Sequence, residues 1–452
     1  MVKDIPQTEN LDKNYEAKDT IEKEQAMQPS GPFASLRFRN FRFLWTGTLL
    51  SNAAQWIQQV TLNWLVYDLT GSGAILGTIN LVRSVASLSM IPAAGVLIDR
   101  INRKKLMMAT ASWLLIISAG LGLVLLSGRG RIAYLFIFSV LGGMVQSIDQ
   151  PLRQVMIFSL VPRAFTPNAM ALIQTGWSIM RSFGPSLGGF LILWFGPGGN
   201  FLIQSFAYAL IILNILFIQF SPQVTTGQRN SVFQNIREGI KYVKSNRQTQ
   251  TFMLVGFILP LFIIPIFSVL PPIYAQDVFK GGPDTLGFLL SAIGVGGIMG
   301  GIVIASLGKM ERRGLLQLSA LFLLSLSLIG FALCTRFWVA LIMMALAGFF
   351  EIIFLTTNQT LLQLSIPNEV RGRVTSIINL NAALAPLGGL VAGFGSDLMG
   401  SPKGITIVLA SIGVLFSIGI FLGSSTVRNY RLSQTISVPH EETTTPTDKI
   451  YS

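Results

Sequence analysis

Charged side chains occur inside several long apolar stretches of this sequence, where a charge is costly and usually faces a cavity. An arginine in such a place can bind an anionic or oxygen-rich molecule, and a carboxyl group can take up and release a proton. The charges concerned are Arg83, Asp149, Arg153, Arg181 and Glu351. We expect Arg83 or Arg181 to bind a small-molecule ligand, and Asp149 or Glu351 to carry a proton.

Some of these charges also have a structural interpretation. Asp149 could instead form an ion pair with an arginine that holds neighbouring segments together, and the sequence leaves both readings open. Arg153 lies toward one end of its apolar stretch, where it could be a gate, an anchor or a ligand contact. Glu351 lies nearer the middle of its stretch with no evident partner on its own helix, which favours the proton-carrying role.

Polar and aromatic side chains recur at helical spacing beside these charges. Asn52, Gln55 and Gln59 form one stripe, with Trp56 on its flank. Such stripes are expected to line a wet cavity between helices. The residues that we predict to contact a substrate are Asn52, Gln55, Trp56, Gln59, Arg83, Gln146, Arg181, Asn358 and Asn379.

The apolar stretches must position these side chains. Of the 452 residues, 51% are hydrophobic and 12% are charged, which is about half the charge of a typical soluble chain. Stretches of about 20 apolar residues can cross a hydrocarbon core of about 30 Å. Pro260 and Pro265 are expected to break one span. The sequence predicts an all-α membrane protein with twelve spanning helices, at 40–67, 73–98, 106–127, 132–158, 167–194, 200–220, 251–277, 285–307, 315–334, 337–363, 372–397 and 404–424.

Lysine and arginine are distributed unequally between the loops. The loops on the side of the chain ends hold fifteen of them and the opposite loops hold five. By the positive-inside rule this excess places both ends in the cytoplasm. The predicted organisation is a disordered cytoplasmic tail at 1–35, a six-helix bundle at 36–220, a cytoplasmic linker with an amphipathic helix at 221–249, a second six-helix bundle at 250–425, and a second disordered cytoplasmic tail at 426–452.

Composition excludes several classes of function. The single histidine, His440, and the single cysteine, Cys334, exclude a histidine metal site and an internal disulfide. The chain has no G-x-x-x-x-G-K-[ST] segment that would bind nucleotide phosphates, and no nucleophile–histidine constellation. The +13 net charge does not indicate a nucleic-acid partner, because the bases lie in loops between apolar spans. We therefore expect neither an enzyme nor a cofactor.

The segment GVLIDRINRK, from Gly95 to Lys104, resembles the G-x-L-A-D-R-x-G-R-K loop between spans 2 and 3 of major facilitator superfamily transporters. Asn102 stands where that loop has its second glycine, and asparagine tolerates a left-handed turn. The resemblance implies an inner gate in which Asp99 faces the N-terminus of span 11, where a helix dipole favours an acid. Anchoring by bases alone would not explain that acid. The implied gating residues are Gly95, Asp99, Arg100, Arg103 and Lys104.

Two further segments narrow the resemblance. DQPLRQVMIFSLVPRAFTPNAMAL (149–172) is similar to the P-x-R-Q…L-V-P-x…N-A-x-A-L signature of an exporter branch that includes the enterobactin exporter and macrolide efflux proteins. GPSLGG (184–189) is similar to the core of the antiporter motif, which is associated with export and adds Gly184 and Pro185 to the gating set. The resemblance implies two pseudo-symmetric six-helix bundles, the major facilitator fold.

The expected function is secondary active export of a small molecule, either a siderophore or a drug-like metabolite, by alternating access and proton antiport. The intramembrane arginines favour an oxygen-rich anion. We expect a monomer in the lipid bilayer of the bacterial inner membrane. The alternatives are a lipid or lysophospholipid transporter of the same fold and a non-transporting membrane sensor or scaffold, for which the two tails show no binding motif.

Overall fold

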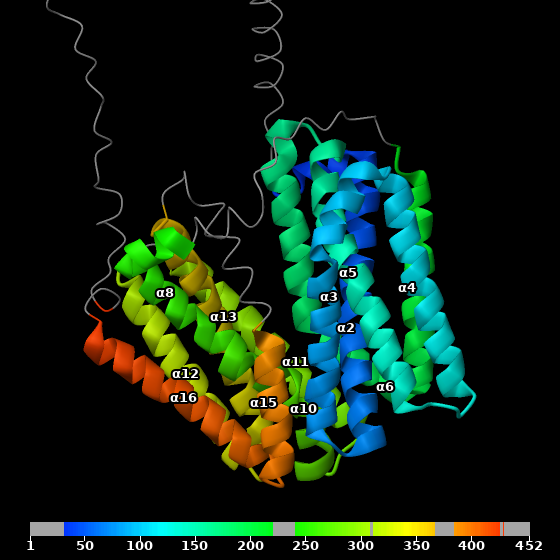
Figure 1. Cartoon of the computed structure of the whole chain (residues 1–452). Helices are drawn as coiled ribbons and strands as arrows, with labels where there is room; N and C mark the ends of the chain where they lie inside the picture. Colours follow the sequence, from blue (N-terminus) through cyan, green and yellow to red (C-terminus); the bar gives the residue numbers. More distant parts are fainter. Residues whose placement is uncertain (1–30, 220–239, 308–310, 367–383, 425–427, 429–452) are drawn as a thin grey trace, which may run out of the picture. The chain divides into compact units, whose positions relative to one another are not determined.

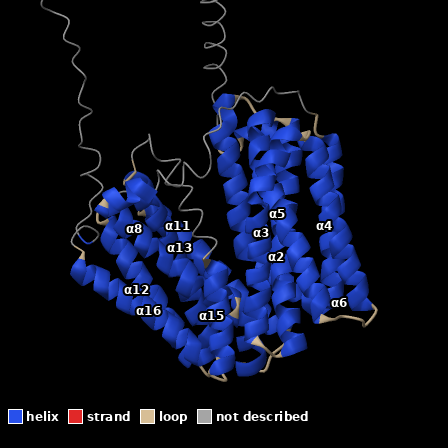
Figure 2. Cartoon of the chain, in the orientation of Figure 1, coloured by secondary structure: helices blue, strands red, loops and turns tan. Residues whose placement is uncertain are grey.

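The computed structural model describes residues 31–219, 240–307, 311–366, 384–424 and 428. Helices account for nearly all of this described part, which contains no β-strand (Figure 2). Contacts divide the chain into two compact units. The first takes in residues up to 228 together with 281–288, and the second takes in 229–280 together with the residues from 289 onward.

Long helices build the first unit (Figure 1): α2 (Arg39–Thr70), α3 (Gly73–Arg100), α4 (Arg103–Leu126), α5 (Ile132–Leu160) and α6 (Thr166–Phe217). α6 contains two of the predicted spans, 167–194 and 200–220. Between them Gly196 has a φ of 68° and interrupts the helical backbone. Glycine adopts this left-handed conformation without a steric penalty, so the break falls between the two predicted spans.

Polar side chains at helix starts fix two of these boundaries. Ser72 accepts a hydrogen bond from the Ile75 N–H at 3.3 Å and caps α3. Asn102 accepts from the N–H groups of Lys104 and Lys105, at 3.0 and 3.3 Å, and caps α4. Its φ is −54°, so Asn102 does not adopt a left-handed conformation here. An asparagine is favoured there because its side-chain oxygen satisfies amides of the first helical turn.

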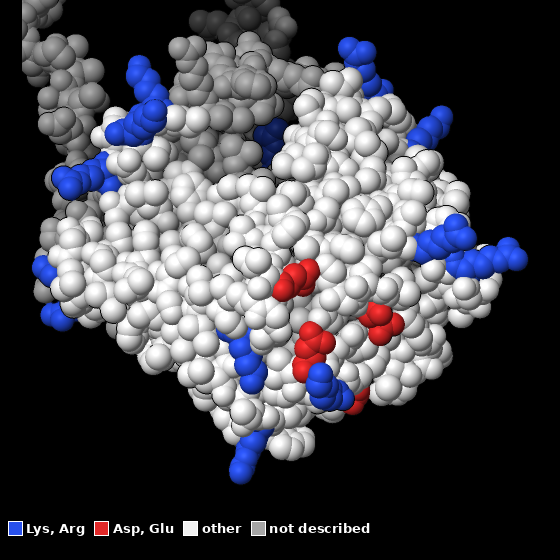
Figure 3. All heavy atoms as spheres, turned by 60° about the horizontal axis from the view of Figure 1, so that its bottom comes forward, with Lys and Arg blue, Asp and Glu red and all other residues white. Residues whose placement is uncertain are grey.

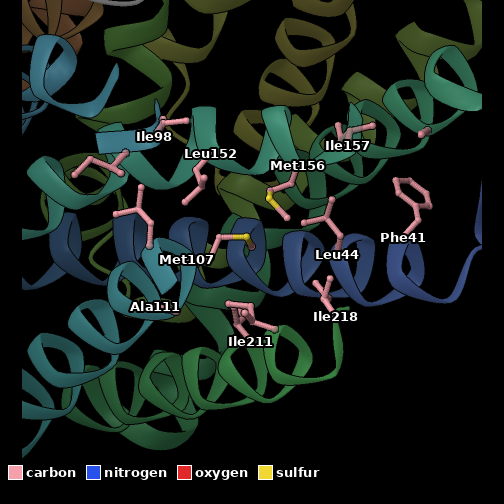
Figure 4. Close-up of a cluster of buried hydrophobic side chains, with 14 of the residues drawn as sticks. Phe41, Leu44, Ile98, Met107, Ala111, Leu152, Met156, Ile157, Ile211 and Ile218 are labelled. Atoms are coloured by element: carbon pink, nitrogen blue, oxygen red, sulfur yellow. The ribbon is translucent and has the colours of Figure 1, made fainter. Parts of the chain in front are cut away.

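Buried apolar side chains form one cluster between the helices of the first unit (Figure 4). It includes Phe41 and Leu44 of α2, Met107 of α4, and Leu152 and Met156 of α5. Lipid tails are as apolar as these side chains, so close packing rather than exclusion from water holds such helices together.

The second unit begins with an irregular span. Regular α-helix in α8 (Arg247–Ile258) gives way to π-helical turns at Leu259–Ile263 and Tyr274–Val278. Pro260 and Pro265 lie in this stretch. Proline cannot donate a backbone hydrogen bond and its ring crowds the preceding turn, so the break expected at these prolines is present.

The remaining helices of the second unit coincide with the predicted spans. Residues 240–245 of the predicted linker 221–249 are also helical, and residues 221–239 lie outside the described residues. The start of the predicted span 372–397 is likewise not described. The helices are α11 (Pro283–Ser306), which belongs to this unit from Leu289 on, α12 (Arg313–Leu333), α13 (Phe337–Leu364), α15 (Ala385–Leu398) and α16 (Pro402–Gly423).

Within the described part, nine helices are long and apolar enough to cross a membrane. One of the nine covers both predicted spans of α6. Large apolar side chains are exposed on several of these helices, for example Ile116, Leu123 and Leu415. Uncharged side chains make up most of the face shown in Figure 3. An apolar exterior of this extent is unusual in soluble proteins and typical of a surface that faces lipid.

Candidate functional site

A buried ion pair lies at the centre of the polar part of the first unit. Asp149 and Arg153 are one turn apart on α5, and their side chains are 0% and 5% exposed. Arg153 Nε donates to Asp149 Oδ2 at 2.7 Å, and Arg153 Nη2 donates to Oδ1 at 3.2 Å. This two-point contact is the strong form of an arginine–carboxylate pair. The proton-carrying role of Asp149 stays a prediction.

Hydroxyl groups from two other helices complete the surroundings of the Asp149 carboxylate. Thr110 Oγ1 on α4 donates to Oδ1 at 3.1 Å, and Ser51 Oγ on α2 lies 3.5 Å from Oδ2. Both hydroxyls are buried. A buried carboxylate is tolerated only when its oxygens are paired, and here the partners come from α2, α4 and α5. The carboxylate therefore fixes the mutual register of three helices.

Amide side chains extend the polar network along α2. Gln150 Nε2 on α5 donates to Gln55 Oε1 at 3.1 Å, and Gln55 Nε2 lies 3.5 Å from Ser51 Oγ. Gln55 and Gln150 are half-buried. The predicted contact residue Gln55 thus connects a partly exposed surface with the hydroxyl next to Asp149.

Arg83 lies on a second part of the same polar stripe. Its Nη2 donates to Gln59 Oε1 at 3.4 Å, and one turn earlier Asn80 Nδ2 donates to Asn63 Oδ1 at 3.1 Å. Gly143 of α5 permits this arrangement, because a Cβ there would lie 2.5 Å from the Arg83 carbonyl oxygen. The structure thus brings together Arg83 and Gln59, two of the predicted substrate contacts, and their contact with a substrate stays a prediction.

The other predicted contact residues of this unit are more scattered. Asn52 is buried on α2, and Gln146 is half-buried on α5. The guanidinium carbon of Arg181 on α6 lies 5.6 Å from the centre of the Trp177 ring, a cation–π distance. Arg83 on α3 and Arg181 on α6 are two separate predicted contacts.

Residues of the predicted gating loop differ in their surroundings. Arg103 Nη1 donates to Ser159 Oγ of α5 at 2.8 Å. Lys104 Nζ donates to the carbonyls of Leu216 and Ile218, at 2.9 and 2.8 Å. Those carbonyls end α6, where a cation is favoured by the helix dipole. Lys104 thus ties the start of α4 to the end of α6.

Gly95, Asp99 and Arg100 are exposed at the end of α3. The predicted partner of Asp99 is the start of span 11. That segment lies at 372–383, outside the described residues, so the gate contact stays a prediction.

The antiporter-like segment places glycines where α6 meets α2. A Cβ on Gly184 would lie 2.6 Å from the Trp56 Cβ, and a Cβ on Gly188 would lie 3.2 Å from the Ile57 Cα. Pro185 is buried beside them. Small residues at these positions let two backbones approach closely. Trp56, predicted as a substrate contact, therefore packs against Gly184.

In the second unit the predicted residues lie on α13. Glu351 is 3% exposed, and Asn358 Oδ1 accepts a hydrogen bond from Gln317 Nε2 of α12 at 2.6 Å. Gly256 leaves room for the Asn358 amide, since a Cβ there would lie 2.9 Å from its nitrogen. Asn379 lies outside the described residues. No group of three His, Cys, Asp or Glu side chains in the described part could hold a metal ion.

Several polar residues of the first unit were not singled out from the sequence. Thr110, Gln58, Gln204 and Tyr208 are buried, and Gln204 Nε2 donates to Gln58 Oε1. Gln204 and Tyr208 are one turn apart, which a search for polar residues at helical spacing could have found. Thr110 gives no such signal, because its role depends on how α4 packs against α5.

Comparison with known proteins supports a transport fold. The family described as "Transmembrane secretion effector" (MFS_3) matches residues 30–445. The staphyloferrin A transporter of Staphylococcus aureus is 25% identical over 371 residues, covering 81% of this chain and 92% of that protein. The multidrug efflux pump Tap of Mycolicibacterium fortuitum is 24% identical over 361 residues, covering 78% of this chain and 88% of the pump.

Solved structures agree with the sequence comparisons at the level of the fold. The crystal structure of a bacterial homolog of the human lysosomal transporter Spinster aligns with a TM-score of 0.66. It covers 88% of this chain and 97% of that chain at 14% sequence identity. The alignment spans both units and confirms the predicted major facilitator architecture.

Proposed function

Because this chain belongs to the transmembrane secretion effector family of the major facilitator superfamily, we propose that it exports an oxygen-rich anion in exchange for inward-moving protons. The chain is a multi-pass membrane transporter of the branch that contains drug and siderophore exporters, and its cargo is a small molecule. It acts in the bacterial plasma membrane. Membership of this family favours transport over a sensor or scaffold role.

Arg83 is the observation that carries the choice of an anion. Its described hydrogen bond, to Gln59, is long at 3.4 Å, whereas a guanidinium has five N–H donors. Arg153, by contrast, is paired with Asp149 by two hydrogen bonds. Arg83 is half-buried on α3 beside a stripe of amides. A carboxylate or catecholate oxygen is the ligand that such a donor set favours.

The names of the relatives narrow the class of molecule that is proposed as cargo. One is named as a transporter of staphyloferrin A and another as a multidrug efflux pump. Together with Arg83, these names favour a siderophore with several acidic oxygens over a cationic dye. We take that class as the proposed substrate.

Glu351 is the proposed proton carrier, with Asp149 as the second candidate. Glu351 is buried on α13, where protonation and deprotonation would change the charge inside the second unit. Asp149 already has an arginine and two hydroxyls around it, which favours a structural task. Asp99 at the end of α3 is the proposed inner gate. We further propose that both chain ends lie in the cytoplasm and that the transporter acts as a monomer.

Proteoliposomes provide the test. The purified full chain is reconstituted with an internal pH dye, and a proton gradient is imposed. Uptake into the proteoliposomes, by molecules whose cytoplasmic face points outward, is measured for an iron-free carboxylate siderophore and, separately, for ethidium. The variants are Arg83→Gln, Glu351→Gln and, as a matched control, Arg131→Gln at the exposed start of α5.

The proposal predicts a different result for each variant. A charge-assisted hydrogen bond contributes about 1.5–3 kcal/mol, so Arg83→Gln should lower transport of the siderophore about 10- to 100-fold at subsaturating concentration. Glu351→Gln should abolish proton-driven accumulation, and Arg131→Gln should leave both unchanged. Unchanged siderophore transport by Arg83→Gln would refute the anion site. Intact proton-driven transport by Glu351→Gln would refute the proton assignment.

A further inference from the structure

Several buried polar atoms in the first unit have no hydrogen-bond partner among the described residues. They are Gln58 Nε2 on α2, Ser118 Oγ on α4, and Asn200 Oδ1, Gln204 Oε1 and Tyr208 Oη on α6. All five side chains are at most 1% exposed. Buried polar groups in folded proteins are almost always hydrogen-bonded to protein or to ordered water. Asn200 is held elsewhere, because its Nδ2 donates to Thr61 Oγ1 and to the Gly188 carbonyl. The other four atoms of this unit still need partners.

Helix register brings the atoms of Gln58, Ser118, Gln204 and Tyr208 to one level of the bundle. Gln204 Nε2 donates to Gln58 Oε1, which joins α6 to α2. A Cβ on Gly142 of α5 would lie 3.6 Å from Gln58 Nε2 and 3.9 Å from Ile117 Cδ1 of α4. Gln58 of α2 and Ile117 of α4 thus face Gly142, which carries no side chain, and Gln204 connects α6 to the same place through Gln58.

Ser118 reaches the same level of the bundle. It follows Ile117 directly, and Thr110 lies about two helical turns before it on α4. Thr110 contacts Asp149, which lies about two turns after Gly142 on α5. The short connection between α4 and α5 makes these helices antiparallel, so the pairing of Thr110 with Asp149 repeats as Ile117 and Ser118 with Gly142.

Tyr208 lies between this level and the ion pair. It is one turn after Gln204 on α6. Its hydroxyl interacts with the Gln204 side chain without a well-formed hydrogen bond, and it lies within electrostatic reach of Asp149 and Arg153. Its ring belongs to the apolar cluster of the first unit. Tyr208 therefore extends the polar level around Gly142 toward the Asp149 carboxylate.

The unpaired atoms identify the ligand by their chemistry. Gln58 Nε2 needs an acceptor and Gln204 Oε1 needs a donor, while the hydroxyls of Ser118 and Tyr208 can act as either. If the oxygen and nitrogen positions of both amides were exchanged, one donor and one acceptor would still lack a partner. A bare cation would meet the amide N–H, and an apolar molecule would satisfy none of the four. Water satisfies all of them.

We propose that Gln58, Ser118, Gln204 and Tyr208 bind ordered water inside the first unit, around Gly142. The site is distinct from the Arg83 stripe, because it lies between α2, α4, α5 and α6 and its polar atoms are fully buried. The bound water adds to the hydrogen bonds that already join these helices at this level, from Gln204 to Gln58 and from Ser205 to the Leu115 carbonyl. It also continues the polar groups that surround Asp149.

Radiolytic hydroxyl-radical labelling tests the proposal on the intact protein in lipid nanodiscs. Millisecond X-ray pulses form radicals from water that is bound inside a protein, and mass spectrometry reads the oxidised side chain. Tyr274 is the matched control: it is as buried as Tyr208, but its hydroxyl lies 2.9 Å from Thr406 Oγ1 and 3.3 Å from the Pro402 carbonyl. Tyr208 should label severalfold faster than Tyr274. Equal rates would overturn the proposal.

A double variant locates the water. Gln58→Met with Gln204→Met removes the donor and the acceptor together, and replacing both partners by apolar groups of similar shape can be nearly neutral for stability. Labelling of Tyr208 should then fall to the rate of Tyr274, with the melting temperature recorded to confirm folding. Unchanged fast labelling in the folded double variant would overturn the assignment of the water to these residues. The comparison of the two tyrosines in the unaltered protein decides the question if the variant does not fold.

Discussion

The Asp149–Arg153 pair offers the sharpest test of how the first unit is held together. Asp149→Asn removes the negative charge and leaves the Arg153 guanidinium buried, with its Nε and Nη2 facing an amide in place of a carboxylate. Breaking a buried ion pair by altering one partner costs about 3–5 kcal/mol. For a helical unit of this size that corresponds to a fall of roughly 6–20 °C in melting temperature.

Removing both charges should behave differently. In Asp149→Leu with Arg153→Met no charge remains buried, and such replacements are often neutral or stabilising by about 1–4 kcal/mol. Thr110 Oγ1 keeps a second partner, the Met107 carbonyl at 3.0 Å, so little is left unsatisfied. We therefore expect the double variant to be more stable than either Asp149→Asn or Arg153→Met.

The assay is a double-mutant cycle followed by tryptophan fluorescence during thermal unfolding in detergent. Asp68→Asn, at an exposed position on α2, serves as the control for loss of one carboxylate and should change stability by less than about 1 kcal/mol. Additive losses across the cycle would refute the reasoning, since they would mean that the two charges do not depend on each other. Transport by the stable double variant then decides whether Asp149 is needed to carry a proton.

Three further predictions concern helix contacts and ends. Gly184→Ala should destabilise the first unit by about 1–3 kcal/mol, because its Cβ would lie 2.6 Å from the Trp56 Cβ, whereas Gly120→Ala, with nothing within 4 Å, should not; equal melting temperatures would contradict this. Asn102→Ala should cost about 0.5–2 kcal/mol through loss of the α4 cap, and rescue by Asn102→Ser would confirm the capping role. Lys104→Met should cost about 0.3–1 kcal/mol, measured as faster amide hydrogen exchange at the end of α6. Unchanged exchange there would show that Lys104 does not cap α6.

Hydrophobic runs were sufficient to predict the helices. The gap between the predicted spans 167–194 and 200–220 contains Gly196, where the backbone turns left-handed. The prolines at 260 and 265 lie where the first span of the second unit becomes π-helical. These features are local, and local conformation follows from residue type. The capping role of Asn102 was not predicted, because an asparagine suits both a left-handed turn and a helix cap.

The site was harder to predict because its partners come from different helices. Spacing alone places Arg153 one turn from Asp149, and the structure confirms that contact. The hydroxyl of Thr110 and the pairing of Gln58 with Gln204 depend on the relative register of neighbouring helices. A sequence without aligned relatives carries no information on that register. The same limit applies to the proposed partner of Asp99.

The position of both pair members on one helix matters for how the protein is made. A lone charge near the middle of a nascent span opposes entry into the bilayer by about 2.5–3.5 kcal/mol. Asp149 and Arg153 are one turn apart on α5, so each can neutralise the other as soon as that turn has formed. The segment can then partition into lipid as a nearly neutral unit before any neighbouring helix arrives, and Thr110 and Ser51 need engage the carboxylate only during later assembly.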